Sequence, residues 1–194
     1  MRLTAISLGI LVLMLTHLVT SQSLPSKIRG YKVYDAKVAV TNTARTDRET
    51  EDPDATVRIL DPAITGISLS GAVVEVGAEI TALNRSGSVD FMTVRDFRVN
   101  GIAIEIEEYT HPFAFKEGEK ISLPTPAKIS INFASLAKAA YKELVDSKKD
   151  WAVTGMVFVF GKFKKFGFSF KRVIPVKIDL TIRNPLTSLA LDPR

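Results

Sequence analysis

The chain has 194 residues, of which 46% are hydrophobic and 24% are charged, and its mean hydropathy is +0.14. This composition is typical of a globular domain and excludes a disordered chain. The net charge of +5 comes from 26 basic and 21 acidic residues, a mixture too even for a surface that grips phosphates, so we expect no nucleic-acid partner. Because there is no cysteine, disulfides, thiolate nucleophiles and zinc–thiolate centres are excluded.

The N-terminus resembles a secretory signal peptide. Residues 5–19 form an apolar run without an acidic residue, shorter than the roughly 20 residues that a membrane-spanning helix prefers, and small polar residues follow it. We therefore expect residues 1–23 to be a leader, cleaved after Ser21 or Ser23, and the protein to be exported to the periplasm or the cell exterior. The alternative is an uncleaved membrane anchor over residues 3–20, because neither cleavage site has the Ala-x-Ala form.

Residues 24–60 are expected to form an N-terminal extension with one strand and one charged loop. Residues 31–40 have the composition of a strand, and residues 45–54 are dense in charge. A cation site is the alternative for this loop, but the spacing and the turn glycine of calcium loops are missing, so we expect no metal. Its ligands would be Glu49, Glu51, Asp52 and Asp54.

Short strands separated by turn residues are expected over residues 57–106. Apolar residues alternate with Glu75, Gly77, Glu79 and Thr81 between positions 72 and 82, which predicts a strand with one face on a core. Asn100 and Gly101 predict a two-residue type I′ turn, because both residues tolerate positive φ. In that hairpin Val99 faces Ile102, Phe97 faces Ile104, and Asp96 opposes Glu105 near Arg98.

The C-terminal half predicts two further strands and one helix. Alternation at residues 127–133 indicates a strand, and a change to helical spacing predicts a short helix over residues 135–146. Residues 174–182 alternate again, with Ile174, Val176 and Ile178 on the apolar face. The fold class is therefore all-β, a two-layer sandwich with one short inserted α-helix, preceded by the signal sequence.

Six short motifs follow one another between residues 61 and 180. They are residues 67–71 with the strand that runs to Asn84, then 97–101, 121–124, the helix, 153–157 and 174–178. In this order they resemble the late-embryogenesis-abundant group 2 domain, also called the water-stress and hypersensitive-response (WHy) domain. The resemblance implies a fibronectin-III or immunoglobulin-like sandwich over residues 61–183, with a tail at 184–194. It also implies a non-enzymatic protein without cofactors that binds or shields something at the cell envelope, as in desiccation stress.

Aromatic and basic residues are interleaved over residues 158–172. Such a segment binds a membrane surface or an envelope protein when its rings reach headgroup depth and its lysines meet anionic lipid. The contact residues would be Lys162, Phe163, Lys164, Lys165 and Phe166. The simpler interpretation is that Phe158 and Phe160 point into the sandwich from one strand, that Phe166, Phe168 and Phe170 do so from the next, and that the lysines solubilise the hairpin tip.

No catalytic site is expected. Outside the leader His111 is the sole histidine, and without cysteine a nucleophile–base pair would need a serine beside it. We interpret His111 as a loop residue. Besides a shielding role, two non-enzymatic roles stay open, a structural subunit of an envelope assembly and a carrier of an apolar ligand or lipid. A carrier requires a cavity between the sheets, and a hydrolase requires a cleft that holds His111 next to a serine and a carboxylate.

Overall fold

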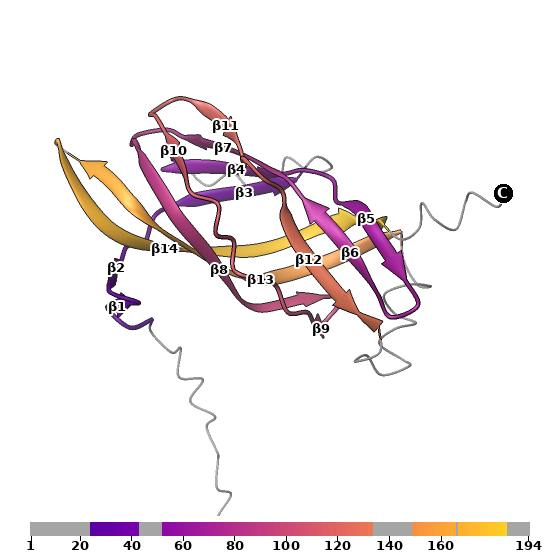
Figure 1. Cartoon of the computed structure of the whole chain (residues 1–194). Coiled ribbons are helices and arrows are strands. Elements are labelled where there is room, and N and C mark those ends of the chain that lie inside the picture. Colours follow the sequence, from indigo (N-terminus) through magenta and orange to yellow (C-terminus); the bar gives the residue numbers. More distant parts are fainter. Residues whose placement is uncertain (1–23, 43–51, 134–148, 166, 186–194) are drawn as a thin grey trace, which may run out of the picture.

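The computed structural model describes residues 24–42, 52–133, 149–165 and 167–185, and these form an all-β sandwich (Figure 1). The all-β class expected from the alternating patterns is confirmed. The expected leader, the helix at 135–146, most of the charged loop at 45–54 and most of the tail lie outside the described residues.

One layer is a seven-stranded sheet built around a long hairpin. Its core strands are β13, Asp150–Lys165, and β14, Phe168–Arg183, which pair antiparallel along their whole length. The expected alternation is confirmed, since Val176 and Ile178 are buried while Lys177 and Asp179 are exposed. The other strands of this sheet are β1 (Lys27–Ile28), β2 (Tyr31–Val33), β8 (Gly87–Val99), β9 (Ile102–Ala103) and β10 (Phe113–Phe115).

The other layer consists of two smaller sheets that pack against this one. Four strands have the order β11–β7–β4–β3, and three have the order β12–β6–β5. Buried Val74 and Ile131 of the three-stranded sheet contact Val153 and Ile178 of the large sheet in one apolar core. The strands are β3 (Val38–Asn42), β4 (Ala55–Ile59), β5 (Ala63–Ser68), β6 (Gly71–Val76), β7 (Ala78–Ala82), β11 (Lys120–Ser122) and β12 (Ala127–Asn132).

Gly77 divides what the sequence predicts as a single strand over residues 72–82. β6 before it pairs with β5 and β12, whereas β7 after it pairs with β4 and β11. The alternation nevertheless continues across the break, with Val74 and Ala78 buried. The outer face is polar as expected, because Glu75 and Glu79 form ion pairs with Lys128 at 3.7 Å and Lys120 at 2.9 Å. One amphipathic run therefore serves two sheets.

The hairpin expected at Asn100 and Gly101 is confirmed. Their φ angles are 50° and 81°, as a type I′ turn requires, and Val99 pairs with Ile102. The ladder ends at Ala103, so the expected opposition of Asp96 and Glu105 does not form. Instead, the register shift where β8 meets β13 includes Asp96, whose φ is 54°. Bulges of this kind bend a strand and increase its twist.

Within the expected extension 24–60, the described residues 24–42 and 52–60 belong to the sandwich. β2 pairs parallel with β14, and β3 pairs parallel with β4 in the second layer. A boundary at residue 61 would therefore cut through both layers. The single strand expected over residues 31–40 is divided between β2 and β3, which join different layers. Local alternation does not specify this division, because parallel pairing joins segments that are distant in sequence.

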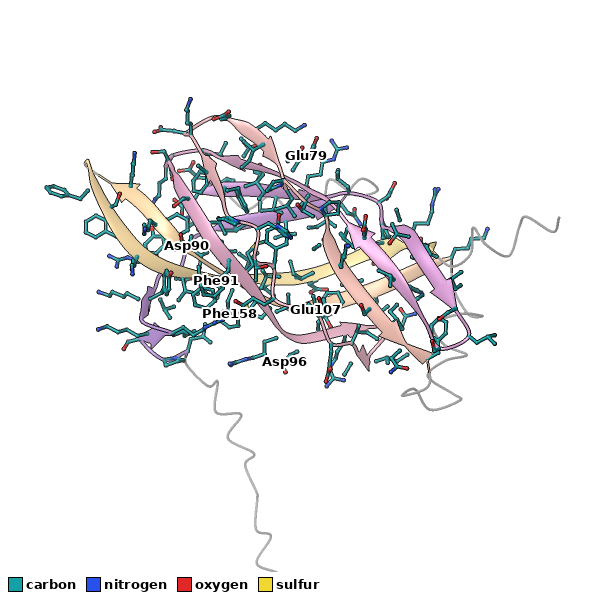
Figure 2. All side chains as sticks on the ribbon, in the orientation of Figure 1. Glu79, Asp90, Phe91, Asp96, Glu107 and Phe158 are labelled. Carbon is teal, nitrogen blue, oxygen red and sulfur yellow. The ribbon has the colours of Figure 1, made fainter. Side chains whose placement is uncertain are left out.

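An aromatic cluster covers the outer face of the large sheet. Phe158 and Phe160 are buried there and do not point between the layers, which corrects the interpretation from the sequence; Figure 2 labels Phe158 beside Phe91. The Phe91 and Phe160 rings stack with centroids 4.4 Å apart, and Tyr31 of β2 lies edge-on to Phe160 at 5.3 Å. Arg29 extends over the Phe91 ring and forms an ion pair with Glu108 at 2.6 Å. The short strands β1 and β2 thus close this second core.

Candidate apolar ligand cavity

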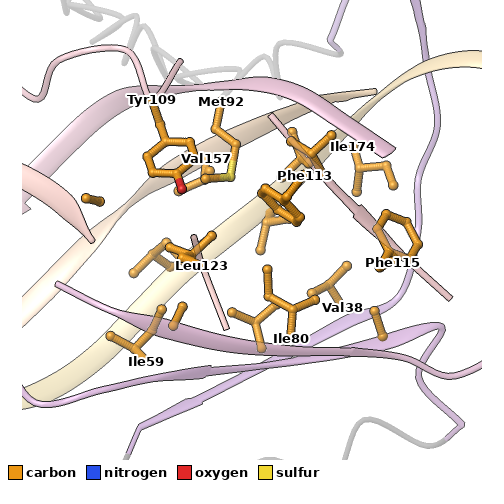
Figure 3. Close-up of a pocket in the computed structure, with 18 of the residues that line it drawn as sticks. Val38, Ile59, Ile80, Met92, Tyr109, Phe113, Phe115, Leu123, Val157 and Ile174 are labelled. Carbon is orange, nitrogen blue, oxygen red and sulfur yellow. The ribbon is translucent and has the colours of Figure 1, made fainter. Parts of the chain in front are cut away.

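A cavity of about 230 Å³ lies between the two layers (Figure 3). Its walls are the inward-facing side chains of β13 and β14 on one side and of β4 and β7 on the other. Strands β3, β8 and β10 and the segments that carry Tyr109 and Leu123 complete it. The residues that line its centre are Val38, Val57, Ile59, Ile80, Met92, Phe113, Val157, Val159 and Ile174.

The cavity separates two well-packed regions of the interior. At one end Trp151, Val153 and Ile131 form the larger core, and at the other Phe115 and Phe163 pack with centroids 6.0 Å apart. Between these ends the second layer contributes small side chains, among them Ala55, Ala78 and Ala82. The valines and isoleucines of β13 and β14 that face these alanines do not reach across the gap. Val157, Val159 and Ile174 therefore stay partly exposed.

Unfilled space of this size is costly. Apolar side chains that line empty space lack van der Waals partners on one side, which lowers stability. A cavity that is costly when empty, and apolar at its centre, is suited to an apolar occupant.

Three polar residues of the wall lie in connections between strands. They are Tyr34, Asp54 and Arg85. The Arg85 guanidinium donates a hydrogen bond to the Tyr34 hydroxyl and lies over the Tyr34 ring, 4.5 Å from its centroid. The Asp54 carboxylate accepts hydrogen bonds from the Lys37 backbone N–H at 3.0 Å and the Asn84 side chain at 2.7 Å. Partial burial opposes ionisation of Asp54, but these two donors, with the charges of Arg85 and Lys37, outweigh it and lower the pKa of its carboxyl.

Tyr109 is the buried polar residue of the opposite wall. Its backbone exchanges two hydrogen bonds of 2.9 Å with Met92, and its hydroxyl accepts one from the Thr125 N–H at 3.4 Å. Burial raises the pKa of the Tyr109 hydroxyl, and the Thr125 hydrogen bond opposes this only in part, so the group stays neutral at physiological pH. Tyr109 therefore adds no charge to this wall.

The structure divides the contact residues that the sequence predicts. Lys162 and Lys164 are exposed, but Phe163 is only 8% exposed, because it packs against Phe115, Val89 and Ala82 at the end of the cavity. Phe163 is therefore an interior residue and not a surface contact. Lys165 is the last residue of β13. Its side chain and the whole of Phe166 lie outside the described part of the structure.

The exposed rings of the segment are ones that the sequence placed inside. Phe168 is 69% exposed and Phe170 is 39% exposed, although both have the parity of the inward face of β14. Alternation correctly predicts that these rings lie on the same face of β14 as Val176 and Ile178. It does not indicate where the opposite layer ends, and so it does not predict that the rings are exposed.

His111 is an exposed residue that does not line the cavity. Its ring lies edge-on to Tyr109, with centroids 5.4 Å apart. Of the residues named for the alternative cation site, Glu49 and Glu51 lie outside the described residues, Asp52 is exposed, and Asp54 accepts from the two donors named above. Across the part of the chain that the structure describes, no three acidic or histidine side chains come close enough to hold a metal ion. Within the same residues, no helix has the length and apolar character that crossing a bilayer requires.

No family model and no curated protein matches the chain. Among solved structures, it is similar to a crystal structure of a protein from Archaeoglobus fulgidus, with 11% sequence identity and a TM-score of 0.37, covering 66% of this chain and 95% of that chain. A TM-score this low carries no argument about fold or function. The architecture therefore rests on the strands and sheets of the protein itself.

Proposed function

We propose that this protein is an exported, non-enzymatic binding protein of the cell envelope that holds an apolar small molecule between its two layers. The observation that supports this function is the cavity of about 230 Å³, whose centre is lined by aliphatic side chains of both layers. Apolar pockets with a few polar groups at their margin are the usual form of a small-molecule site.

The cavity volume limits the size of the ligand. An engineered apolar cavity of about 150 Å³ takes up benzene or xenon, whereas pockets for drug-sized molecules measure about 300–1,000 Å³. A cavity of about 230 Å³ therefore suits one small ring system or a short alkyl chain. A polar end group of that ligand would lie near Tyr34 and Arg85, since the remaining central wall offers few hydrogen-bonding partners.

This proposal selects one of the roles that the sequence left open. A carrier of an apolar ligand requires space between the sheets. The cavity therefore favours the carrier over the shielding role and over the structural subunit. Export remains part of the proposal because residues 1–23 have the pattern of a leader. Membership of the late-embryogenesis-abundant group 2 family, and with it a role in desiccation stress, is supported by the order of the sequence motifs alone.

Filling the cavity tests the function. Val157 lies on the inward face of β13, where it is partly exposed to the cavity (Figure 3). The Val157→Phe substitution fills that space, so we expect the affinity for a small neutral fluorescent probe, naphthalene, to fall about tenfold or more. The melting temperature should stay the same or rise, because the added ring fills an existing void. Fluorescence titration and thermal denaturation measure the two effects.

The matched control is Val73→Phe, which makes the same change on the outward side of β6, between the buried residues Ala72 and Val74. This variant should bind the probe as the unmodified protein does. Equal affinity of Val157→Phe and the unmodified protein would overturn the proposal. So would a protein that binds no probe and, when recovered gently from its own cells, shows no added mass by native mass spectrometry.

A further inference from the structure

The hairpin of β13 and β14 extends beyond the strands on both sides of it (Figure 1). The last residue of β13 that pairs with β8 is Phe163, opposite Gly87, and the first residue of β14 that pairs with β2 is Arg172. Beyond these points the two strands continue to pair with each other, up to Lys165 and Phe168. Among the described strands, this tip has no ladder partner outside the hairpin.

The two faces of the tip differ in chemistry. Cross-strand partners share a face, so the pairing of Phe163 with Phe170 and of Lys165 with Phe168 places the rings on the inward face. The pairing of Lys162 with Lys171 places those lysines on the outward face, together with Lys164, and all three are exposed. The tip therefore has exposed lysines on its outward face. Its inward face carries two exposed rings together with Arg172, whose guanidinium lies 5.1 Å from the centroid of the Phe170 ring.

The charge of the hairpin has one sign. Residues 151–178 contain six lysines and arginines and no aspartate or glutamate, although acidic residues are almost as frequent as basic ones in the whole chain. Five of the six lie between residues 162 and 172. This concentration at one end distinguishes the tip from the rest of the surface, where ion pairs such as Lys120–Glu79 and Lys128–Glu75 are formed.

We propose that this tip docks the protein on an anionic lipid surface. Phe168 and Phe170 would enter the interface to the depth of the headgroups, and Lys162, Lys164 and Lys171 would meet the lipid phosphates. Aromatic rings favour this interfacial depth, and each lysine near an anionic leaflet contributes about 1 kcal/mol. Two cations of this tip contact rings, Lys171 at 5.8 Å from the Tyr31 centroid and Arg172 at 5.1 Å from the Phe170 centroid. A lipid surface complements such a cationic tip with adjacent solvent-exposed rings, and no acidic residue of residues 151–178 opposes its approach.

The same face of the hairpin leads to the cavity. Phe170 pairs with Phe163, which lines the end of the cavity, and Ile174 and Val159 continue the wall further along. Docking by the tip would place this apolar face between the bilayer and the cavity, on the route of an apolar ligand. The docking proposal nevertheless stands on the tip residues alone and does not depend on the cavity being occupied.

Co-sedimentation of the purified protein with vesicles tests the docking. The protein should sediment with phosphatidylcholine vesicles that contain phosphatidylglycerol, and less with phosphatidylcholine alone or at high salt, because salt screens the lysines. Phe168→Ser with Phe170→Ser, and separately Lys162→Glu with Lys164→Glu, should each weaken binding about tenfold or more. Their melting temperatures should match that of the unmodified protein, since the replaced side chains are exposed.

Matched controls come from the rest of the surface. Ile67 and Leu69 are 58% and 104% exposed at the β5–β6 turn, so Ile67→Ser with Leu69→Ser makes the same apolar loss away from the tip. Lys128→Glu with Lys177→Glu makes the same charge change. Both control variants should bind vesicles normally, and Val157→Phe should do so too, which separates docking from cavity binding. Normal sedimentation of either tip variant, or retention of a single-stranded oligonucleotide instead of vesicles, would overturn the proposal.

Discussion

Asp54 shows how one side chain links the ends of three segments. It precedes β4, and its carboxylate receives hydrogen bonds from the Lys37 backbone, just before β3, and from Asn84, just after β7. The Leu83 backbone N–H also donates to the Asp54 carbonyl oxygen at 3.0 Å. A carboxylate in this position holds the loop that carries Arg85 beside the wall of the cavity. Hydrogen bonds to a charged acceptor stabilise more than neutral ones.

We expect Asp54→Asn to lower the free energy of unfolding at pH 7 by about 1–2 kcal/mol, because an amide cannot accept from both donors in the same geometry. The pKa of this carboxyl is lowered in the folded protein, so its contribution is present above the unfolded pKa near 3.9 and is lost as the pH falls below that value. The difference between the two proteins should therefore shrink in acid. Urea denaturation at pH 7 and in acid measures it.

Asp35→Asn, at an exposed aspartate close by in the chain, is the control and should change the unfolding free energy little. A stability difference for Asp54→Asn that stays constant as the pH falls would contradict the account of the Asp54 carboxylate.

At the scale of the elements, β8 and β13 approach each other unusually closely near the tip. A Cβ atom at Gly161 would overlap the carbonyl oxygen of Ser88, in the region where the register of the two strands shifts. Backbone atoms cannot rotate away as a flexible side chain can. The absence of a side chain at Gly161 therefore permits the bulge that leads into the hairpin tip.

Gly161→Ala should lower the free energy of unfolding by about 1–3 kcal/mol, because the methyl group forces the strands apart. Gly66→Ala in β5 is the matched control, since its Cβ would lie 3.7 Å from the nearest atom, the Cβ of Val73, at an ordinary contact distance. That change should stay within about 0.5 kcal/mol. Chemical denaturation compares the two variants, and equal stabilities would show that the strands separate without cost.

At the scale of the whole molecule, two cores share one sheet. The inner face of β13 and β14 packs against the second layer and the cavity, and the outer face carries Phe158, Phe160 and Val173 under β1 and β2. Phe160 and Val173 are fully buried in this outer cluster. β1 and β2, at the edge of the same sheet, therefore close the aromatic cluster with the side chains of Ile28, Tyr31 and Val33.

Deleting residues 24–33 should uncover this cluster and lower the free energy of unfolding by several kcal/mol, about 1.5–3 for each large apolar side chain that becomes exposed. The shortened protein should also bind 8-anilinonaphthalene-1-sulfonate more strongly. Arg29→Ala is the control, because it removes only a partly exposed ion pair, which contributes at most about 1 kcal/mol, and the overlying ring contact. If the deletion leaves both measurements unchanged, β1 and β2 do not cover a core.

Features that depend on neighbouring residues were predictable from the chain. Two adjacent residues with positive φ define the turn at Asn100 and Gly101, and alternation with a period of two determines that Val74 and Val176 face inward while Glu75 and Lys177 face outward. These are local properties of a pleated backbone, so the all-β class and most strands were predictable. The site residues were predictable only in part, since the exposure of Lys162 and Lys164 was expected but the burial of Phe163 was not.

The tertiary structure alone decided what depends on distant partners. Alternation does not specify which segment covers a face, so the division of one strand between two sheets at Gly77, the cover of Phe160 by β2 and the exposure of Phe168 were not readable from the chain. The cavity belongs to the same class of features. The volume of the cavity is the space between the two layers minus the volume of the side chains that fill it. Pairings between residues far apart in the sequence determine that space.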